Sequence, residues 1–126
     1  MSSFKELGVS DSILKAIEEL GFEQPMPVQE AVIPYLLKEG SGDVVALAQT
    51  GTGKTAAFGI PAIQKTEVER PEAQFLILSP TRELCVQIAS DLKDFSHYVE
   101  GLHIIPMYGG SSIENQIRNF KRGAHI

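Results

Sequence analysis

The stretch that decides the fold is Ala48-Gln49-Thr50-Gly51-Thr52-Gly53-Lys54-Thr55. It lies between a short apolar run, residues 44–48, and a stretch of helical periodicity, residues 53–64. A glycine-rich turn between a strand and a helix can direct successive backbone N–H groups toward a phosphate, and the helix adds the positive end of its dipole. Gly51 and Gly53 are expected where φ is positive or where a side chain would block this approach. The stretch therefore predicts a phosphate-binding loop.

Two polar residues at the end of the loop indicate its ligand. Lys54 is expected to reach the β- and γ-phosphates of a nucleoside triphosphate, and the Thr55 hydroxyl is expected to ligate Mg²⁺ that arrives with the nucleotide. We therefore predict catalytic roles for both residues. The nucleotide itself is expected to be bound by the loop residues Gln49, Thr50, Gly51, Thr52, Gly53, Lys54 and Thr55.

A dinucleotide-binding turn is the main rival interpretation, because residues 51–56 also match the pattern Gly-x-Gly-x-x-Ala. That fold needs an acidic residue at the end of its second strand, and here the corresponding strand ends in Leu78-Ser79-Pro80. It also has no use for the Lys54-Thr55 pair. A glycine turn of purely structural meaning is the remaining alternative. Ala48 stands where the general phosphate-loop pattern has glycine, so the loop must belong to a class that tolerates a side chain there.

Helical stretches and short apolar runs alternate along most of the chain. Apolar spacing, caps and breakers predict helices at residues 10–20, 27–38, 53–64, 83–98 and 112–122. Strands are predicted at residues 44–48, 74–79 and 102–107, with residues 123–126 as the approach to a fourth. This alternation predicts an α/β fold in which helices flank a parallel sheet.

Bulk properties restrict the remaining possibilities. A chain of 126 residues is long enough for one domain and too short for two ordinary ones. No apolar run approaches the roughly 18 to 20 residues of a membrane span, and the first residues lack the order of a signal peptide. The single cysteine, Cys85, cannot form an internal disulfide. We therefore expect a cytoplasmic protein without a membrane partner, although the net charge of −5 is unusual for a protein that binds polyanions.

Residues 21–29, between the first two predicted helices, suggest a second contact to a nucleotide. Phe22 has a flat apolar face that can stack on a purine. The Gln29 amide has donors and an acceptor that match the amine and ring nitrogen of adenine, whereas guanine presents a different pattern. The alternative is a helix-turn-helix joint in which Phe22 and Phe4 are core residues and Gln29 lies on the surface.

Two further turns follow predicted strands and so lie at the carboxyl edge of the sheet, where α/β folds place ligands. Pro80 ends a strand, and Thr81 is a good N-cap whose hydroxyl can face a phosphate, with Arg82 beside it to supply charge. Gly109 and Gly110 end the next strand and would let another backbone approach closely. The alternatives are an ordinary strand-to-helix turn and a flexible glycine turn.

Taken together, these motifs resemble the DEAD-box RNA helicases. Phe4, Phe22, Pro25 and Gln29 have the spacing of that family's Q motif, which precedes a loop of the form Ala-x-Thr-Gly-x-Gly-Lys-Thr and so accounts for Ala48. The resemblance implies that Phe22 stacks on adenine, that Gln29 recognises it, and that Phe4 supports the site to which Gln24 also belongs. It also implies RNA-backbone contacts from the family's motif Ia and GG segment, here Pro80, Thr81, Arg82, Glu83, Gly109 and Gly110.

The resemblance also predicts the organisation and the activity. Residues 1–42 correspond to a helical Q-motif segment, and residues 43–126 to the first part of a RecA-like phosphate-loop domain that is incomplete at its C-terminus. No Asp-Glu-Ala-Asp box is found, so we expect a portion of an ATP- and Mg²⁺-dependent enzyme that remodels RNA duplexes or ribonucleoproteins with a second RecA-like domain. This portion alone is predicted not to hydrolyse ATP. A small-molecule kinase and a non-catalytic binding module with a vestigial loop are the alternative functions.

Overall fold

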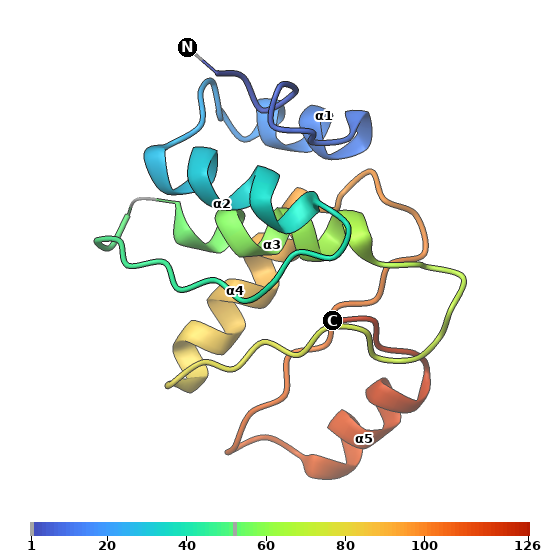
Figure 1. The fold of residues 1–126 in the computed structure, drawn as a ribbon. Helices are drawn as coiled ribbons and strands as arrows, with labels where there is room; N and C mark the ends of the chain where they lie inside the picture. The colour runs from blue at the N-terminus through green and yellow to red at the C-terminus, as the bar shows by residue number, and fades with distance from the viewer. Residues whose placement is uncertain (1, 52) are drawn as a thin grey trace.

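The computed structural model describes residues 2–51 and 53–126, so the predicted contact of Thr52 lies outside the described residues. The helices of this part of the chain are α1 (Asp11–Glu19), α2 (Pro27–Leu37), α3 (Lys54–Lys65), α4 (Arg82–Phe95) and α5 (Ile113–Lys121), shown in Figure 1. All five predicted helices are confirmed, and each begins within one residue of its predicted start. The apolar spacing and the N-cap residues were therefore sufficient signals for the helices.

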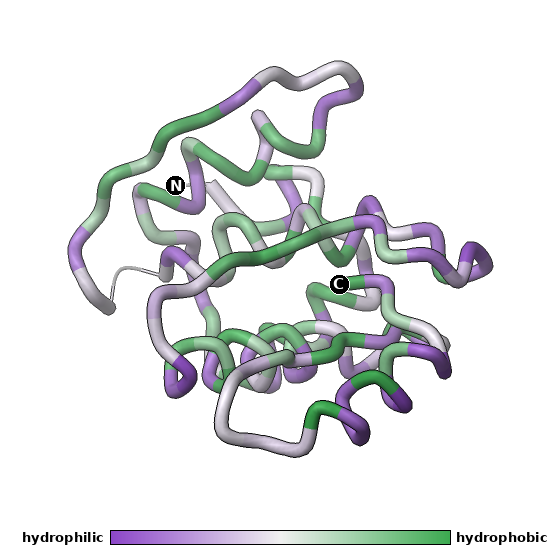
Figure 2. Tube along the Cα trace, turned by 90° about the horizontal axis from the view of Figure 1, so that it is seen from below, coloured by the Kyte–Doolittle hydropathy of each residue, from purple (hydrophilic) through white to green (hydrophobic). Residues whose placement is uncertain are grey.

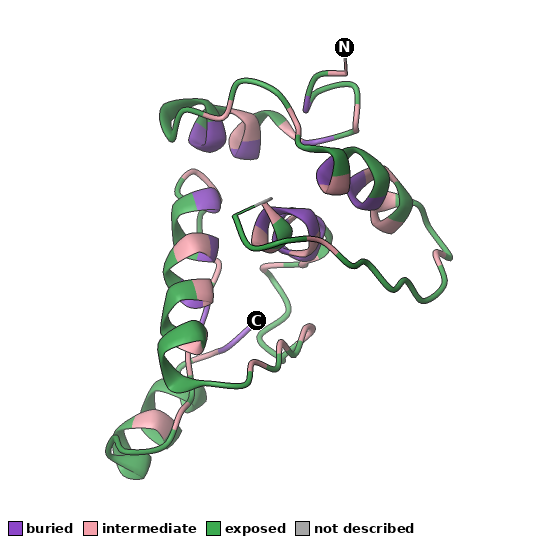
Figure 3. Cartoon of the chain, turned by 90° about the vertical axis from the view of Figure 1, so that its left-hand side faces the viewer, coloured by how far each residue is buried: buried purple, intermediate pink, exposed green. Residues whose placement is uncertain are grey.

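The core is built around α3. This helix buries most of its length and packs against both α2 and α4, while α1 packs against α4. Figure 3 shows the buried sides of α2 and α4 turned toward α3, which is seen end-on between them. The helix carries the predicted phosphate loop at its N-terminus, so the packing of α2 and α4 also fixes where that loop lies.

A glycine inside α3 permits its close approach to α4. A Cβ atom built on Gly59 would collide with Cδ2 of Leu92, a side chain that is only 1% exposed. Phe95, one turn further along α4, lies at van der Waals distance from the same Cβ position. Gly59 therefore sets the separation of these two helices.

The N-terminal segment is fastened to this core by polar side chains. The Gln64 amide of α3 accepts a hydrogen bond from Ser10 N (2.9 Å) and donates one to the Gly8 carbonyl (2.8 Å). Farther along, the Tyr98 hydroxyl donates to the two carboxylate oxygens of Glu19 (2.6 and 2.8 Å), which raises the pKa of Tyr98 above its ordinary value. Lys15 lies over the Tyr98 ring, 4.3 Å from its centroid.

The predicted strands are not confirmed by this structure. No residue in the described ranges is in a β-strand, and residues 44–48, 74–79 and 102–107 have no regular secondary structure. Figure 2 shows hydrophobic runs along coil as well as along helices. Val45, Leu47, Leu76 and Leu78 are between 83% and 95% exposed. A strand requires a neighbouring backbone about 4.7–4.9 Å away, and an apolar run cannot supply that partner by itself.

The end of the chain comes nearest to sheet-like pairing. His125 N donates to the His103 carbonyl (2.9 Å), and Ile105 N donates to the Ile126 carbonyl (3.0 Å). On the other side, Gln74 N donates to the His125 carbonyl (2.9 Å). Residues 123–126 thus lie between the second and third predicted strands and are hydrogen-bonded to both, although no ladder is formed. In the described part of the chain no helix has the length and apolarity needed to cross a membrane.

The contact between Gly59 and Leu92 predicts an unusual sign for a glycine-to-alanine change. In an exposed helix Gly59→Ala would be worth about 1 kcal/mol of stability. Overpacking a buried site costs about 1–3 kcal/mol, and Leu92 is 1% exposed. We therefore expect Gly59→Ala to lower the free energy of unfolding by about 1 kcal/mol, the difference between these terms, in urea titrations. In a Leu92→Ala background the same change should be neutral or stabilising; an equal loss in both backgrounds would contradict the packing argument.

Candidate nucleotide-binding site

The predicted phosphate loop has the backbone conformation that its glycines suggested. Gly51 has φ +79° and Gly53 has φ +81°, both in the left-handed region that other residues rarely adopt. Gly53 is the N-cap of α3, which begins at Lys54. The N-terminus of a helix presents free N–H groups and the positive end of the dipole. The loop can therefore bind an anion.

Gln29 is the side chain packed most closely against this loop. The residue is 1% exposed; its Oε1 accepts a hydrogen bond from Met26 N (2.8 Å), and its Nε2 donates to the Gly53 carbonyl (3.2 Å). A Cβ atom on Gly53 would collide with this amide. The interpretation that places Gln29 on the surface is therefore wrong. An amide has two N–H donors and an oxygen with two lone pairs, so these two bonds use half of its capacity.

Phe22 and the loop line one cavity. Its volume is about 560 Å³, and Phe22 of the turn after α1 lines it together with Thr50, Gly51, Gly53, Lys54 and Thr55. Pockets of about 300–1,000 Å³ are typical of small-molecule sites. Lys54 is exposed, whereas Thr55 is half-buried. The fold thus brings the two predicted parts of a nucleotide site, which are far apart in the sequence, to the same cavity.

Aromatic packing fixes Phe22 in this cavity. The Phe4 ring lies 6.1 Å from the Phe22 ring, centroid to centroid, and the Phe95 ring meets Phe22 edge-on at 5.8 Å. Phe4 and Phe95 are buried, while Phe22 is half-buried. Tilted and edge-to-face ring pairs are favourable beyond the area that they bury. Phe4 therefore supports Phe22 as the sequence suggested, and Phe95 is a second support that the sequence analysis missed.

Some predicted site residues lie apart from the cavity, and some lining residues were missed. Gln24 and Gln49 are exposed and do not line it. Asp91 and Asp94 of α4 do line it. Charged residues three positions apart on a helix are typical of a solvated face, so their spacing gave no signal for a site.

A second group of predicted residues gathers at the start of α4. Thr81 is the N-cap, and its Oγ1 accepts a hydrogen bond from Leu84 N (3.1 Å), as its residue type suggested. Arg82 is exposed and pairs with Glu83 at 3.7 Å between Nη2 and Oε1. Pro80 precedes this cap and is also exposed. An exposed pair of this kind contributes little to stability, so the guanidinium is free to meet another anion.

Gly110 brings the second glycine turn to Arg82. Its φ is +79°, and Arg82 Nη1 lies 2.5 Å from the position that a Cβ atom would occupy. Any side chain at residue 110 would therefore displace the guanidinium. Gly109, beside it, is exposed and has no atom within 4 Å of its Cβ position. The two segments that the sequence assigned to one ligand thus meet in space.

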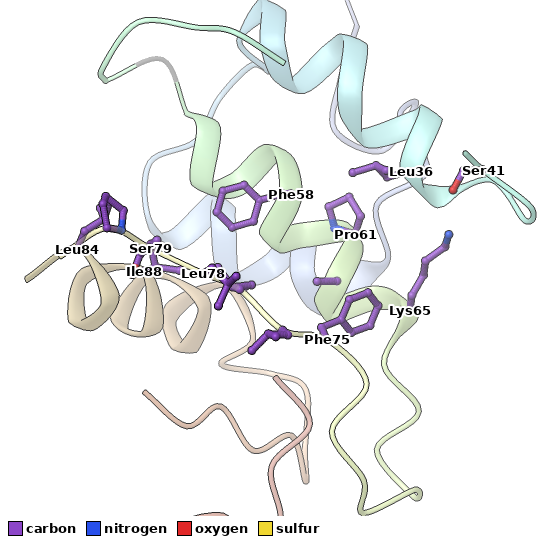
Figure 4. Close-up of a pocket in the computed structure, with 14 residues that line it drawn as sticks. Leu36, Ser41, Phe58, Pro61, Lys65, Phe75, Leu78, Ser79, Leu84 and Ile88 are labelled. Carbon is purple, nitrogen blue, oxygen red and sulfur yellow. The ribbon is translucent and has the colours of Figure 1, made fainter. Parts of the chain in front are cut away.

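An apolar groove lies beside the nucleotide cavity. It has a volume of about 630 Å³ and runs between α3 and residues 75–80. In the close-up of Figure 4, Phe58 and Pro61 of α3 face Phe75 and Leu78 across it. Leu84 and Ile88 of α4 line both the groove and the nucleotide cavity. The groove is therefore the side of α3 against which a sheet would be expected to pack.

A helix that begins at left-handed glycines beside a cavity is an arrangement that phosphate-binding proteins use. Residues 26–126 match the family model of the DEAD/DEAH box helicases. The chain belongs to this family. It is 45% identical to the DEAD-box ATP-dependent RNA helicase CshA of Geobacillus kaustophilus, over 100% of this chain and 26% of that protein. The chain therefore spans about a quarter of the length of this curated relative.

Solved structures give the same result. A DEAD box protein from the hyperthermophile Methanococcus jannaschii superposes with a TM-score of 0.91 at 41% identity, over 98% of this chain and 33% of that one. The RNA helicase Prp28 from Chaetomium thermophilum bound to ADP superposes with a TM-score of 0.85 at 35% identity, over 100% of this chain and 31% of that one. This likeness is consistent with a partial RecA-like fold, although the described residues do not form its sheet.

The burial of Gln29 predicts that replacing its amide nitrogen with oxygen destabilises the fold. In Gln29→Glu the carboxylate can still accept from Met26 N but can no longer donate to the Gly53 carbonyl. We expect the free energy of unfolding to fall by about 1–3 kcal/mol at neutral pH, because a buried carbonyl loses its donor and faces a negative charge. Urea unfolding measures this loss. Gln24→Glu is the matched control, since it introduces the same charge at an exposed position of the same turn. Equal effects of the two changes would contradict the burial of Gln29.

Proposed function

We propose that this chain is the ATP-binding portion of an ATP-dependent RNA helicase. Residues 1–42 are the Q-motif segment in this proposal, and residues 43–126 are the first part of the first RecA-like domain. The observation that carries it is the cavity shared by Phe22 and the phosphate loop. Family membership and the curated relative named as an ATP-dependent RNA helicase support the same function. A cytoplasmic location is part of the proposal, since ATP and RNA are intracellular molecules.

The residues around the cavity fit an adenine nucleotide with Mg²⁺. Gly51 has no atom within 4 Å of the position that a Cβ atom would occupy, and the N-terminus of α3 with Lys54 supplies positive charge for phosphates. In the proposal the loop amides and Lys54 hold phosphates, and the Thr55 hydroxyl holds the metal. Phe22 stacks on the base and Phe4 supports it. Gln24, Gln49 and Thr52 complete the nucleotide-binding set.

Gln29 has a double role in this proposal. It holds the Gly53 carbonyl, and its second N–H and remaining lone pair recognise adenine. Gln29 is 1% exposed and does not line the cavity, so base recognition requires a local shift around Gln29 when the nucleotide binds. The two roles predict different effects on base preference, which makes them separable.

The start of α4 and the second glycine turn form the proposed contact with RNA. Thr81, Arg82 and Gly110 would bind the sugar-phosphate backbone, with Pro80, Glu83 and Gly109 beside them. Backbone contacts position a strand without reading its sequence. One exposed arginine at the N-terminus of α4 supports such a contact despite the net charge of −5.

The remaining parts of the enzyme are proposed to lie in the rest of the protein. The apolar groove beside α3 and the exposed Leu76 and Leu78 support a sheet completed by further strands. Phosphate-loop enzymes also need an aspartate for the metal and a group that orients the attacking water. We propose that the Asp-Glu-Ala-Asp box and a second RecA-like domain supply these groups. The complete protein would then use ATP to separate short RNA duplexes or to remodel ribonucleoproteins.

Base preference tests the adenine role of Gln29. We expect the complete protein to bind ADP more tightly than GDP. Gln29→Ala should lower the ratio of the dissociation constant for GDP to that for ADP about tenfold, because paired hydrogen bonds to a base contribute roughly 1–3 kcal/mol of discrimination. Titration calorimetry with both nucleotides measures the ratio, and Asn119→Ala, which removes an exposed amide from α5, is the control. If Gln29→Ala weakens both nucleotides equally, Gln29 only supports Gly53. If the unmutated protein shows no preference, the kinase alternative gains support.

Hydrolysis tests the function as a whole. We expect RNA-stimulated ATP hydrolysis by the complete protein, and a loss of about 100-fold or more in kcat for Lys54→Ala, because the phosphates lose a fixed positive charge. Release of inorganic phosphate measures the rate. Lys65→Ala removes the same charge from the other end of α3, where Lys65 only donates to the Lys38 carbonyl, and should change little. Residues 1–126 alone should not exceed background; a turnover stimulated by RNA in that segment would contradict the need for the remaining parts.

A further inference from the structure

The glycine turn at residues 109–110 is held from α5 by one side chain. Gln116 Oε1 accepts a hydrogen bond from Tyr108 N (2.8 Å), and Gln116 Nε2 donates to the Tyr108 carbonyl (2.9 Å). The amide thus satisfies both backbone groups of the residue immediately before the turn. Two simultaneous bonds fix the backbone of Tyr108 on both of its peptide groups, which one bond would not do.

The same segment is tied to α4 on its other side. The Cys85 thiol, one turn after Arg82, donates to the Met107 carbonyl at 3.7 Å. Adjacent residues, Met107 and Tyr108, are therefore bonded to two different helices. Gly110 follows this segment in the chain. Because Gly110 has no side chain, Nη1 of Arg82 can lie next to it. The path from Gln116 to Arg82 is thus continuous through bonded and packed groups.

The apolar contacts of α5 are shallow. No residue of this helix, all of which the structure describes, is buried. Its apolar side chains Ile113, Ile117 and Phe120 are 70%, 44% and 46% exposed. The Gln116 amide is consequently a principal attachment between α5 and the turn, and its loss would not be masked by a surrounding core.

We propose that Gln116 is a positioning residue for RNA binding: it fixes the Gly109-Gly110 turn and, through Gly110, the Arg82 guanidinium. The proposal rests on the function proposed above for Arg82 and Gly110. The Gln116 amide itself hydrogen-bonds to the backbone of Tyr108. Its effect therefore concerns RNA alone, because the nucleotide cavity is lined by other residues.

The test is steady-state ATP hydrolysis by the complete protein with a single-stranded oligouridylate as the RNA. Gln116→Met keeps the length of the side chain and removes both hydrogen bonds. We expect the KM for RNA to rise about tenfold, while kcat at saturating RNA and the KM for ATP change less than about twofold, the pattern of a lost binding interaction. Gln87→Met on α4 is the matched control, because the Gln87 amide donates to Asp91 of the same helix (2.9 Å). A merely structural role would instead lower kcat and the melting temperature together.

A second measurement tests the route through Arg82. In an Arg82→Ala background, Gln116→Met should leave the KM for RNA unchanged, because two residues that act through one group are not additive. An unchanged KM in the single variant, or an equal rise in both backgrounds, overturns the proposal. Should Gln116→Met fail to fold, Gln116→Glu replaces it, with Asn119→Asp as the control for the added charge on α5. If the unmutated protein is not stimulated by RNA, the proposed function fails and the positioning role fails with it.

Discussion

The Gln29 amide lies between the starts of two helices, and the geometry of the nucleotide site depends on it. One bond, from Met26 N, closes the N-terminus of α2, and the other, to the Gly53 carbonyl, holds the turn from which α3 begins. Only a glycine at residue 53 leaves room for this amide. Since α3 also forms the centre of the core, the contact couples the predicted base-recognition segment to both the phosphate loop and the hydrophobic packing.

The helices were predictable from the sequence because their signals are local. Apolar spacing marks the buried face, Thr81 and Ser112 accept hydrogen bonds from the first turns that they cap, and Gly21 with φ +85° follows α1. The strands were not predictable in the same sense. An apolar run such as residues 74–79 indicates that a segment can be buried. Strand pairing also requires a second backbone, which the run does not specify.

The features of the candidate site also differ in whether they could be predicted from the sequence. Positive φ at Gly51 and Gly53 follows from the chemistry of the loop, and the meeting of Arg82 with Gly110 follows from placing both turns at one edge. The burial of Gln29 and the backbone bonds of Gln116 could not be predicted. A glutamine on a helix is ordinarily solvated, and its spacing does not reveal whether a distant carbonyl and N–H lie within reach. Such contacts are decided by tertiary packing.

Helix α4 joins the two halves of the proposed site. Arg82 lies at its first turn beside the glycine turn, and Phe95 at its last turn supports Phe22 in the nucleotide cavity. Leu84 and Ile88, between them, line both this cavity and the apolar groove. A helix of 14 residues is about 21 Å long and moves as a rigid element. If nucleotide and RNA bind where proposed, a displacement of one end of α4 must also move the other end. Nucleotide and RNA must then change each other's affinity by the same factor.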